Sequence, residues 1–158
     1  MSDTAHAHAN MPCSPDDTEA FLTVADEIAT SRGQRMTRIR RKVLRLLIEA
    51  PEPAKAYDLL ERLDGEGSAK PPTVYRALDF LQDLGLAHKI ESLNAYVACG
   101  HASHRHSAIF LICEKCGRAE ELHSVNTTQA LKAETEAAGF ALSRAVTEAR
   151  GLCRACAA

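Results

Sequence analysis

The sequence predicts a two-domain α/β chain, in which a winged helix-turn-helix precedes a smaller α/β domain. Helical periodicity dominates the first half and gives way to two short strand-like runs, at residues 87–90 and 96–98. The second half then changes to the order strand, strand, helix, strand. Two Cys-x-x-Cys pairs lie in that second half and mark it as a separately stabilised unit.

The N-terminal half begins with a tail and three helices. Residues 1–15 are small and polar, with two prolines, and predict a flexible tail. A first helix starts at Asp16 or Asp17 and ends before Gly33. Thr37 can cap a second helix that runs to about Ala50, and a short third helix covers residues 54–63.

The fourth helix shows which of its faces is exposed. Two prolines suit its first turn, and an apolar stripe runs along one side as far as Gly85. Tyr75 and Arg76 therefore face outward near the N-terminal end, whereas Asp79 and Asp83 lie further back. An acid-free, positive helix end suits entry into the major groove of DNA. With the hairpin around residues 92–94, these helices predict a winged helix-turn-helix, a DNA-binding domain.

Charge is distributed unevenly over the 158 residues, although the formal net charge is only −2. Residues 1–31 carry six acids and no lysine or arginine, while residues 32–89 carry twelve bases against eight acids. Seven bases between residues 32 and 45 stand without an acid among them and could neutralise phosphates, although a solvated helix face would look the same. They are Arg32, Arg35, Arg38, Arg40, Arg41, Lys42 and Arg45.

The apolar stretches are far shorter than the roughly 18 to 20 residues of a membrane-spanning helix. The N-terminus has neither a basic region nor an apolar region of the secretory type. We therefore expect a cytoplasmic protein with no membrane partner.

Four cysteines have the spacing of a structural zinc site. Cys113 and Cys116 form one pair, and Cys153 and Cys156 form the other. Each pair can bring two sulfurs to one tetrahedral ion, so that the shell is closed to water and the site stabilises structure. A redox dithiol and a disulfide are the competing interpretations, and the second requires an exported protein.

The zinc site helps to explain a domain that is small for its fold. Strands are expected near residues 108–112, 118–122 and 140–148, with a helix at about residues 127–138. An α/β domain of about 65 residues buries too little apolar surface to be very stable on its own. A bound structural zinc ion and contacts with a partner subunit would both compensate for this small core.

A second constellation surrounds one of the two remaining cysteines. Cys13 lies in the tail and is assigned no role. Cys99 follows the hairpin in a histidine-rich region with two acids further on, which favours a mixed-ligand metal site bridging the two domains. The candidates are His88, His101, His104, His106, Glu120 and Glu121, and solvated loop histidines are the alternative.

Longer motifs add a family resemblance over residues 20–156. They are KPPTVYRALDFLQDLGLAHKIES, YVAC, HSAIFLICEKCG and EARGLCRAC. In this order they closely resemble the ferric uptake regulator (Fur) family, and look most like its zinc uptake regulator (Zur) branch. The resemblance implies a homodimeric, metal-dependent repressor with a DNA-binding domain at residues 16–98, a hinge at 99–107 and an α/β dimerisation domain at 108–158.

The resemblance also implies residue roles. It places a regulatory metal on His88, Cys99, His106 and Glu121, which gives two zinc ions per subunit with the four-cysteine site. It places the recognition helix at Thr73, Tyr75 and Arg76, and makes Tyr57 a further DNA contact. Arg40 and Arg41 belong to the basic cluster expected on the phosphates.

Two departures from the family pattern bear on the metal. Iron-type members have a His-His-Asp-His run where this chain has His104-Arg105-His106-Ser107, and many relatives have histidine in place of Arg150. Both changes weaken a third site, to which His101, His104, His123 and Glu120 could still contribute. The thiolate of Cys99 argues against peroxide-sensing iron and suits zinc.

We therefore expect a zinc-responsive repressor that binds operator DNA as a homodimer when its regulatory site is loaded, and controls zinc uptake genes. An iron-, manganese- or nickel-sensing member of the family is the alternative. An enzyme with Cys99 as nucleophile and a pure thiol–disulfide switch are rivals from other classes. No further catalytic motif supports the first, so we expect no enzymatic activity.

Overall fold

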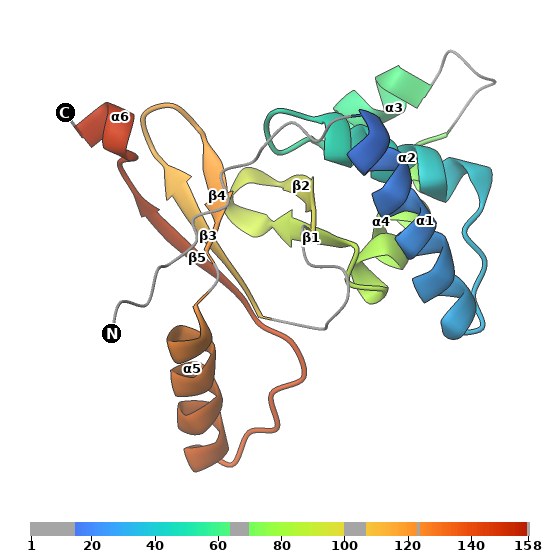
Figure 1. Ribbon diagram of the computed structural model, residues 1–158. Coiled ribbons are helices and arrows are strands. Elements are labelled where there is room, and N and C mark those ends of the chain that lie inside the picture. The colour runs from blue at the N-terminus through green and yellow to red at the C-terminus, as the bar shows by residue number, and fades with distance from the viewer. Residues whose placement is uncertain (1–14, 64–69, 100–106, 123, 158) are drawn as a thin grey trace. The chain divides into compact units, whose positions relative to one another are not determined.

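In the computed structural model, the chain folds into two compact units that divide between residues 104 and 105 (Figure 1). The structure describes residues 15–63, 70–99, 107–122 and 124–157. We call residues 15–99 the N-terminal unit and residues 107–157 the C-terminal unit. Among the described residues, no helix has the length and apolar character needed to cross a membrane.

Helices α1 (Pro15–Ser31) and α2 (Arg38–Glu49) open the N-terminal unit close to their predicted limits. Gly33, with φ of 66°, takes the left-handed conformation that ends α1. The hydroxyl of Thr37 accepts a hydrogen bond from the amide of Arg40 at 3.4 Å, which caps α2 as predicted.

Helices α3 (Ala56–Leu63) and α4 (Pro71–Asp83) follow. The prediction that the third helix starts at residue 54 is wrong by two residues, because Ala54 forms an antiparallel bridge with Tyr96 instead. The Asp58 carboxylate accepts a hydrogen bond from the amide of Lys55 at 3.3 Å, directly before α3. The prolines at the start of α4 were correctly placed in its first turn.

The four helices share one apolar core. Leu22, Leu44, Leu59 and Leu78, one from each helix, are all fully buried. The buried side of α4 contains the predicted apolar residues Val74, Ala77, Leu78 and Leu81, and it also contains Phe80, which was not predicted. Burial of this kind stabilises by roughly 25 cal/mol for each Å² of apolar surface removed from water. The N-terminal unit therefore holds its own fold.

Strands β1 (Ala87–Ile90) and β2 (Ala95–Ala98) form the wing, an antiparallel hairpin. The short 3-10 helix η2 (Glu91–Leu93) and Asn94, with φ of 47°, make the turn. Ala87 and Tyr96 belong to the helical core. Since side chains alternate along a strand, the neighbouring positions of both strands point to the opposite face.

The C-terminal unit contains a three-stranded sheet with β3 (Ala108–Cys113) at its centre (Figure 1). Strand β4 (Ala119–Glu121) pairs with it antiparallel, and β5 (Val146–Gly151) pairs with it parallel. Helix α5 (Val125–Ala137), capped by Ser124, connects β4 to β5, and α6 (Arg154–Ala157) ends the unit.

The last strand was predicted incorrectly at both ends. Residues 140–145 form no strand, and β5 continues past residue 148 to Gly151. Its register with β3 runs from Ala108 opposite Val146 to Cys113 opposite Gly151, so β3 sets its limits. Helix α6, with only four residues, was not predicted.

Candidate metal centres and nucleic-acid surface

The four predicted zinc ligands come together in the C-terminal unit. Cys113 ends β3 and Cys116 lies in the turn after it, while Cys153 precedes α6 and Cys156 lies within it. All four sulfurs lie within 4.8 Å of one another, and those of Cys116 and Cys153 are 3.8 Å apart. Two sulfurs about 2.3 Å from one tetrahedral ion would be separated by about 3.8 Å. All four thiols are free, and four sulfurs at this spacing are a donor set that fits zinc.

Local hydrogen bonds prepare this site for a cation. The amide of Cys153 donates to the sulfur of Cys113 at 3.4 Å. This bond and a second from the amide of Cys116 lower the pKa of Cys113 to about 6. Hydrogen bonding with Cys153 and burial raise the pKa of Cys156 to about 12. The Cys113 thiol therefore loses its proton more readily than the Cys156 thiol, and a bound cation would favour the thiolate form of both.

A second pair of side chains that could bind a metal lies in the wing and directly after it. His88 is on β1 opposite Val97, and Cys99 follows β2, where its amide donates to the carbonyl of Leu86 at 2.9 Å. The imidazole and the thiol lie within 4.8 Å of each other. His88 is only 7% exposed and Cys99 is fully buried, yet neither belongs to the helical core. A buried imidazole beside a buried sulfur fits borderline-soft Zn2+.

Of the other two predicted regulatory ligands, one lies in the C-terminal unit and the other lies outside the described residues. Glu121 is half-buried at the end of β4 in the C-terminal unit. His106 lies outside the described residues, as do His101, His104, His123 and Cys13. Glu120 is half-buried on β4. Participation of Glu121 and His106 in the regulatory site, and a third site that includes Glu120, remain predictions.

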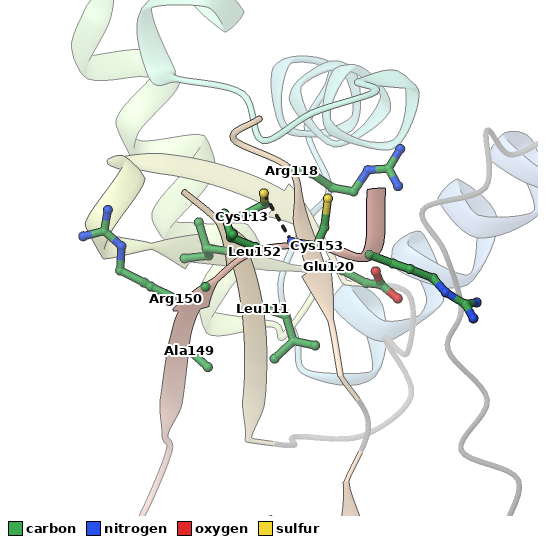
Figure 2. Close-up of a pocket in the computed structure, with 11 residues that line it drawn as sticks. Leu111, Cys113, Arg118, Glu120, Ala149, Arg150, Leu152 and Cys153 are labelled. Carbon is green, nitrogen blue, oxygen red and sulfur yellow. Dashed lines mark hydrogen bonds between the residues drawn. The ribbon is translucent and has the colours of Figure 1, made fainter. Parts of the chain in front are cut away.

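A hollow of about 340 Å³ opens beside the four-cysteine site (Figure 2). Figure 2 shows Cys113 and Cys153 joined by their hydrogen bond next to Leu152, with Arg118 and Arg150 on opposite sides. Pairing of β3 with β5 brings Leu111 and the residues around Arg150 into the same lining. No local pattern in the sequence indicated this hollow, because it depends on a parallel pairing between distant segments.

The predicted base-contacting side chains are all exposed on two helices of the N-terminal unit. Thr73, Tyr75 and Arg76 lie in the first two turns of α4, and Tyr57 lies in the first turn of α3. Tyr75 is 47% exposed and Tyr57 is 68% exposed, although large aromatic side chains are usually buried. These residues give the helix-turn-helix a surface that can hydrogen-bond and stack.

Arg40 and Arg41, predicted to contact phosphates, both have partners within the chain. The guanidinium of Arg40 lies over the Phe80 ring, 3.6 Å from its centroid, and donates to the carbonyl of Arg35 at 2.6 Å. Arg41 forms ion pairs with Glu19 and Asp26 of α1. Their contact with DNA remains a prediction, and their internal partners are a second role that the sequence did not indicate.

Glu19 of α1 is an acidic partner of these arginines, and its pKa is shifted. Glu19 accepts hydrogen bonds from both Arg45 and Arg41. These bonds, that of Arg45 above all, hold the pKa of the Glu19 carboxyl below its usual range. Helix α1 thus neutralises part of the basic cluster of α2.

A winged helix-turn-helix with a buried metal-ligating pair in its wing defines a class of metal-dependent DNA-binding proteins. Residues 31–148 match the family described as Ferric uptake regulator family. The chain belongs to the ferric uptake regulator family.

Within this family, the chain is similar to several zinc uptake regulators. The chain is 42% identical over 142 residues to the zinc uptake regulation protein of Escherichia coli strain K12, which covers 88% of this chain and 82% of that protein. It is similar to a zinc uptake regulator solved with zinc and DNA, with a TM-score of 0.81, 42% identity and coverage of 89% of this chain and 95% of that one. It is also similar to holo XcZur, with a TM-score of 0.78, 46% identity and coverage of 87% and 97%.

Proposed function

We propose that this chain is a zinc-responsive transcriptional repressor that binds operator DNA and controls zinc uptake genes. The observation that carries the proposal is the buried pair of His88 and Cys99 in the wing of a helix-turn-helix. The similarity of the chain to a zinc uptake regulator solved with zinc and DNA supports the same function. Regulation is preferred to catalysis because both side chains are closed to a substrate.

His88 and Cys99 would hold the regulatory zinc together with Glu121 and His106. Zinc accepts mixed nitrogen, sulfur and oxygen ligands and has no redox chemistry that would oxidise the thiolate. Glu121 belongs to the C-terminal unit, so shared ligands would restrict the hinge at residues 99–107. A bound ion that favours one arrangement shifts the population by its differential affinity, and 100-fold tighter DNA binding needs about 2.7 kcal/mol of coupling.

DNA contacts would divide between base edges and phosphates. Tyr57, Thr73, Tyr75 and Arg76 are exposed and would reach the bases and their methyl groups. Arg35 is exposed and would neutralise phosphate, and Arg40 and Arg41 would add to the same field as far as their internal partners allow.

The working unit would be a cytoplasmic homodimer with two zinc ions per subunit. Five large apolar side chains of the C-terminal unit are exposed in the single chain, and a second copy could cover them. These are Leu111, Val125, Phe140, Val146 and Leu152.

The test is DNA binding against buffered free zinc, iron, manganese and nickel, using duplexes selected from genomic fragments by the zinc-loaded protein. Zinc should tighten binding by about 100-fold. Cys99→Ser should lose that response while keeping its dimeric state and its structural zinc, and Cys13→Ser is the matched control. A full zinc response in Cys99→Ser would remove Cys99 from the site, and a stronger response to another metal would change the sensed ion.

A further inference from the structure

We propose that β2 transmits the state of the metal-ligating pair to the helix-turn-helix through a backbone bridge between Tyr96 and Ala54. In this view Tyr96 and Ala54 are positioning residues that fix the start of α3 and so the DNA contact of Tyr57. The inference rests on the proposed function and adds a route that lies wholly within the N-terminal unit.

The bridge consists of two backbone hydrogen bonds of ordinary length. The amide of Ala54 donates to the carbonyl of Tyr96 at 2.9 Å, and the amide of Tyr96 donates to the carbonyl of Ala54 at 2.8 Å. Each residue both donates a hydrogen bond to the other and accepts one from it, as in a hydrogen-bonded pair of an antiparallel sheet. The segment that enters α3 is thereby attached to the wing as a third strand of one residue.

The bridge lies close to both functional sites. Tyr96 is one residue from Val97, which stands opposite His88, and three residues before Cys99. Ala54 is two residues before α3 begins and three before Tyr57. The Tyr96 side chain is only 5% exposed and packs in the helical core, so β2 cannot shift without disturbing the helices.

The position of the metal-ligating pair gives the bridge its function. His88 is on β1 and Cys99 directly follows β2, so side chains that hold one ion would cross-link the two strands. An isolated two-stranded hairpin is marginally stable, and a cross-link should reduce its opening. If β2 opened less often, the hydrogen bonds between Tyr96 and Ala54 would stay formed and would fix the orientation of α3.

Hydrogen exchange tests this without any mutation. Full-length protein with its four-cysteine site loaded is compared before and after zinc fills the second site. Exchange of the amides of Ala54 and Tyr96 should slow by about tenfold or more. Unchanged exchange at both amides, with zinc bound to His88 and Cys99, would overturn the inference.

Ala54→Pro tests the effect on DNA binding, because proline removes one donor of the bridge. Ala54→Ser keeps the donor and serves as the control. A zinc-induced tightening of about 100-fold should fall to about tenfold or less in Ala54→Pro and stay near 100-fold in Ala54→Ser. A merely structural role would weaken binding equally with and without zinc and leave this ratio unchanged, which would also contradict the proposal.

The two levels of failure are distinguishable. If wild-type DNA binding ignores zinc, the proposed function fails, whatever the exchange data show. If the wild type responds to zinc and Ala54→Pro responds equally, only the bridge is excluded. Should Ala54→Pro fail to fold, the exchange measurement on the wild type decides.

Discussion

The two units of this chain are stabilised in different ways. Every helix of the N-terminal unit from α1 to α4 contributes fully buried leucines or valines to one core. In the C-terminal unit, by contrast, α5 and β5 bury no residue fully, and Leu111 in the central strand is 41% exposed. Its buried apolar side chains come from β3 alone among the described residues.

This difference assigns different work to the two metal-ligating groups. The four cysteines connect the end of β3 and the turn after it to the segment after β5, so an ion bound there would compensate for the small core. His88 and Cys99 lie in a unit that already has a core, so an ion there is free to act as a signal. Four predictions test this comparison, from the largest effect to the smallest.

Cys113→Ser should unfold the C-terminal unit and leave the N-terminal unit intact. The substitution removes a buried cysteine whose sulfur accepts a hydrogen bond from the amide of Cys153, and structural zinc contributes about 10 to 16 kcal/mol in small zinc-dependent domains. Limited proteolysis and zinc content should show a protected N-terminal fragment and loss of the structural ion. A stable dimer without that zinc would show that the sheet folds unaided.

Leu44→Ala should lower the stability of the subunit, whereas Leu111→Ala should weaken dimerisation. Leu44 is fully buried, so its truncation should cost about 2 to 5 kcal/mol of unfolding free energy while zinc content stays constant. Leu111 is exposed in the single chain, so its truncation should weaken dimerisation and change subunit stability little. Chemical denaturation and sedimentation measure the two quantities, and equal destabilisation by both variants would erase the contrast.

Much of the N-terminal unit could be predicted from the sequence because its signals are local. Thr37, the two prolines of α4 and Gly33 each act within a few residues, and the apolar stripes repeat at helical spacing. The late start of α3 could not be predicted, since Ala54 bonds with a residue 42 positions further along the chain.

The same distinction applies to the sites. The spacing of the cysteines identified the four-cysteine group, whose sulfurs the structure brings together. The parallel register of β5 and the internal partners of Arg40 arise from tertiary pairing and have no local signal. For the regulatory site, the sequence offered several histidines, and only His88 and Cys99 meet within one unit of the described chain.

Arg40→Ala should lower the free energy of unfolding and leave the salt dependence of DNA binding nearly unchanged. It removes the stacking on Phe80 and the hydrogen bond to the carbonyl of Arg35, at a cost of about 1 to 2 kcal/mol. Arg35→Ala, at an exposed position, is the matched comparison and should lower the salt slope by about one instead. If Arg40→Ala changes only the slope, Arg40 binds phosphate.

Acid should weaken the attachment of α1 to α2. Because Arg45 and Arg41 lower the pKa of Glu19 in the folded chain, this carboxylate stabilises the fold above its unfolded pKa of about 4.3. That stabilisation is lost as pH falls through the lower folded value. Glu19→Gln should abolish this part of the pH dependence, in denaturation curves at low salt. An unchanged curve would mean that solvent fully screens these pairs.

The most direct test of the account is anomalous diffraction at the zinc edge from crystals of the fully loaded protein. We expect two zinc peaks per subunit, one among the four cysteine sulfurs and one bound by the His88 imidazole and the Cys99 sulfur. A second peak that touches neither His88 nor Cys99, or no second peak at saturating zinc, would contradict the assignment of the signalling ion to the wing.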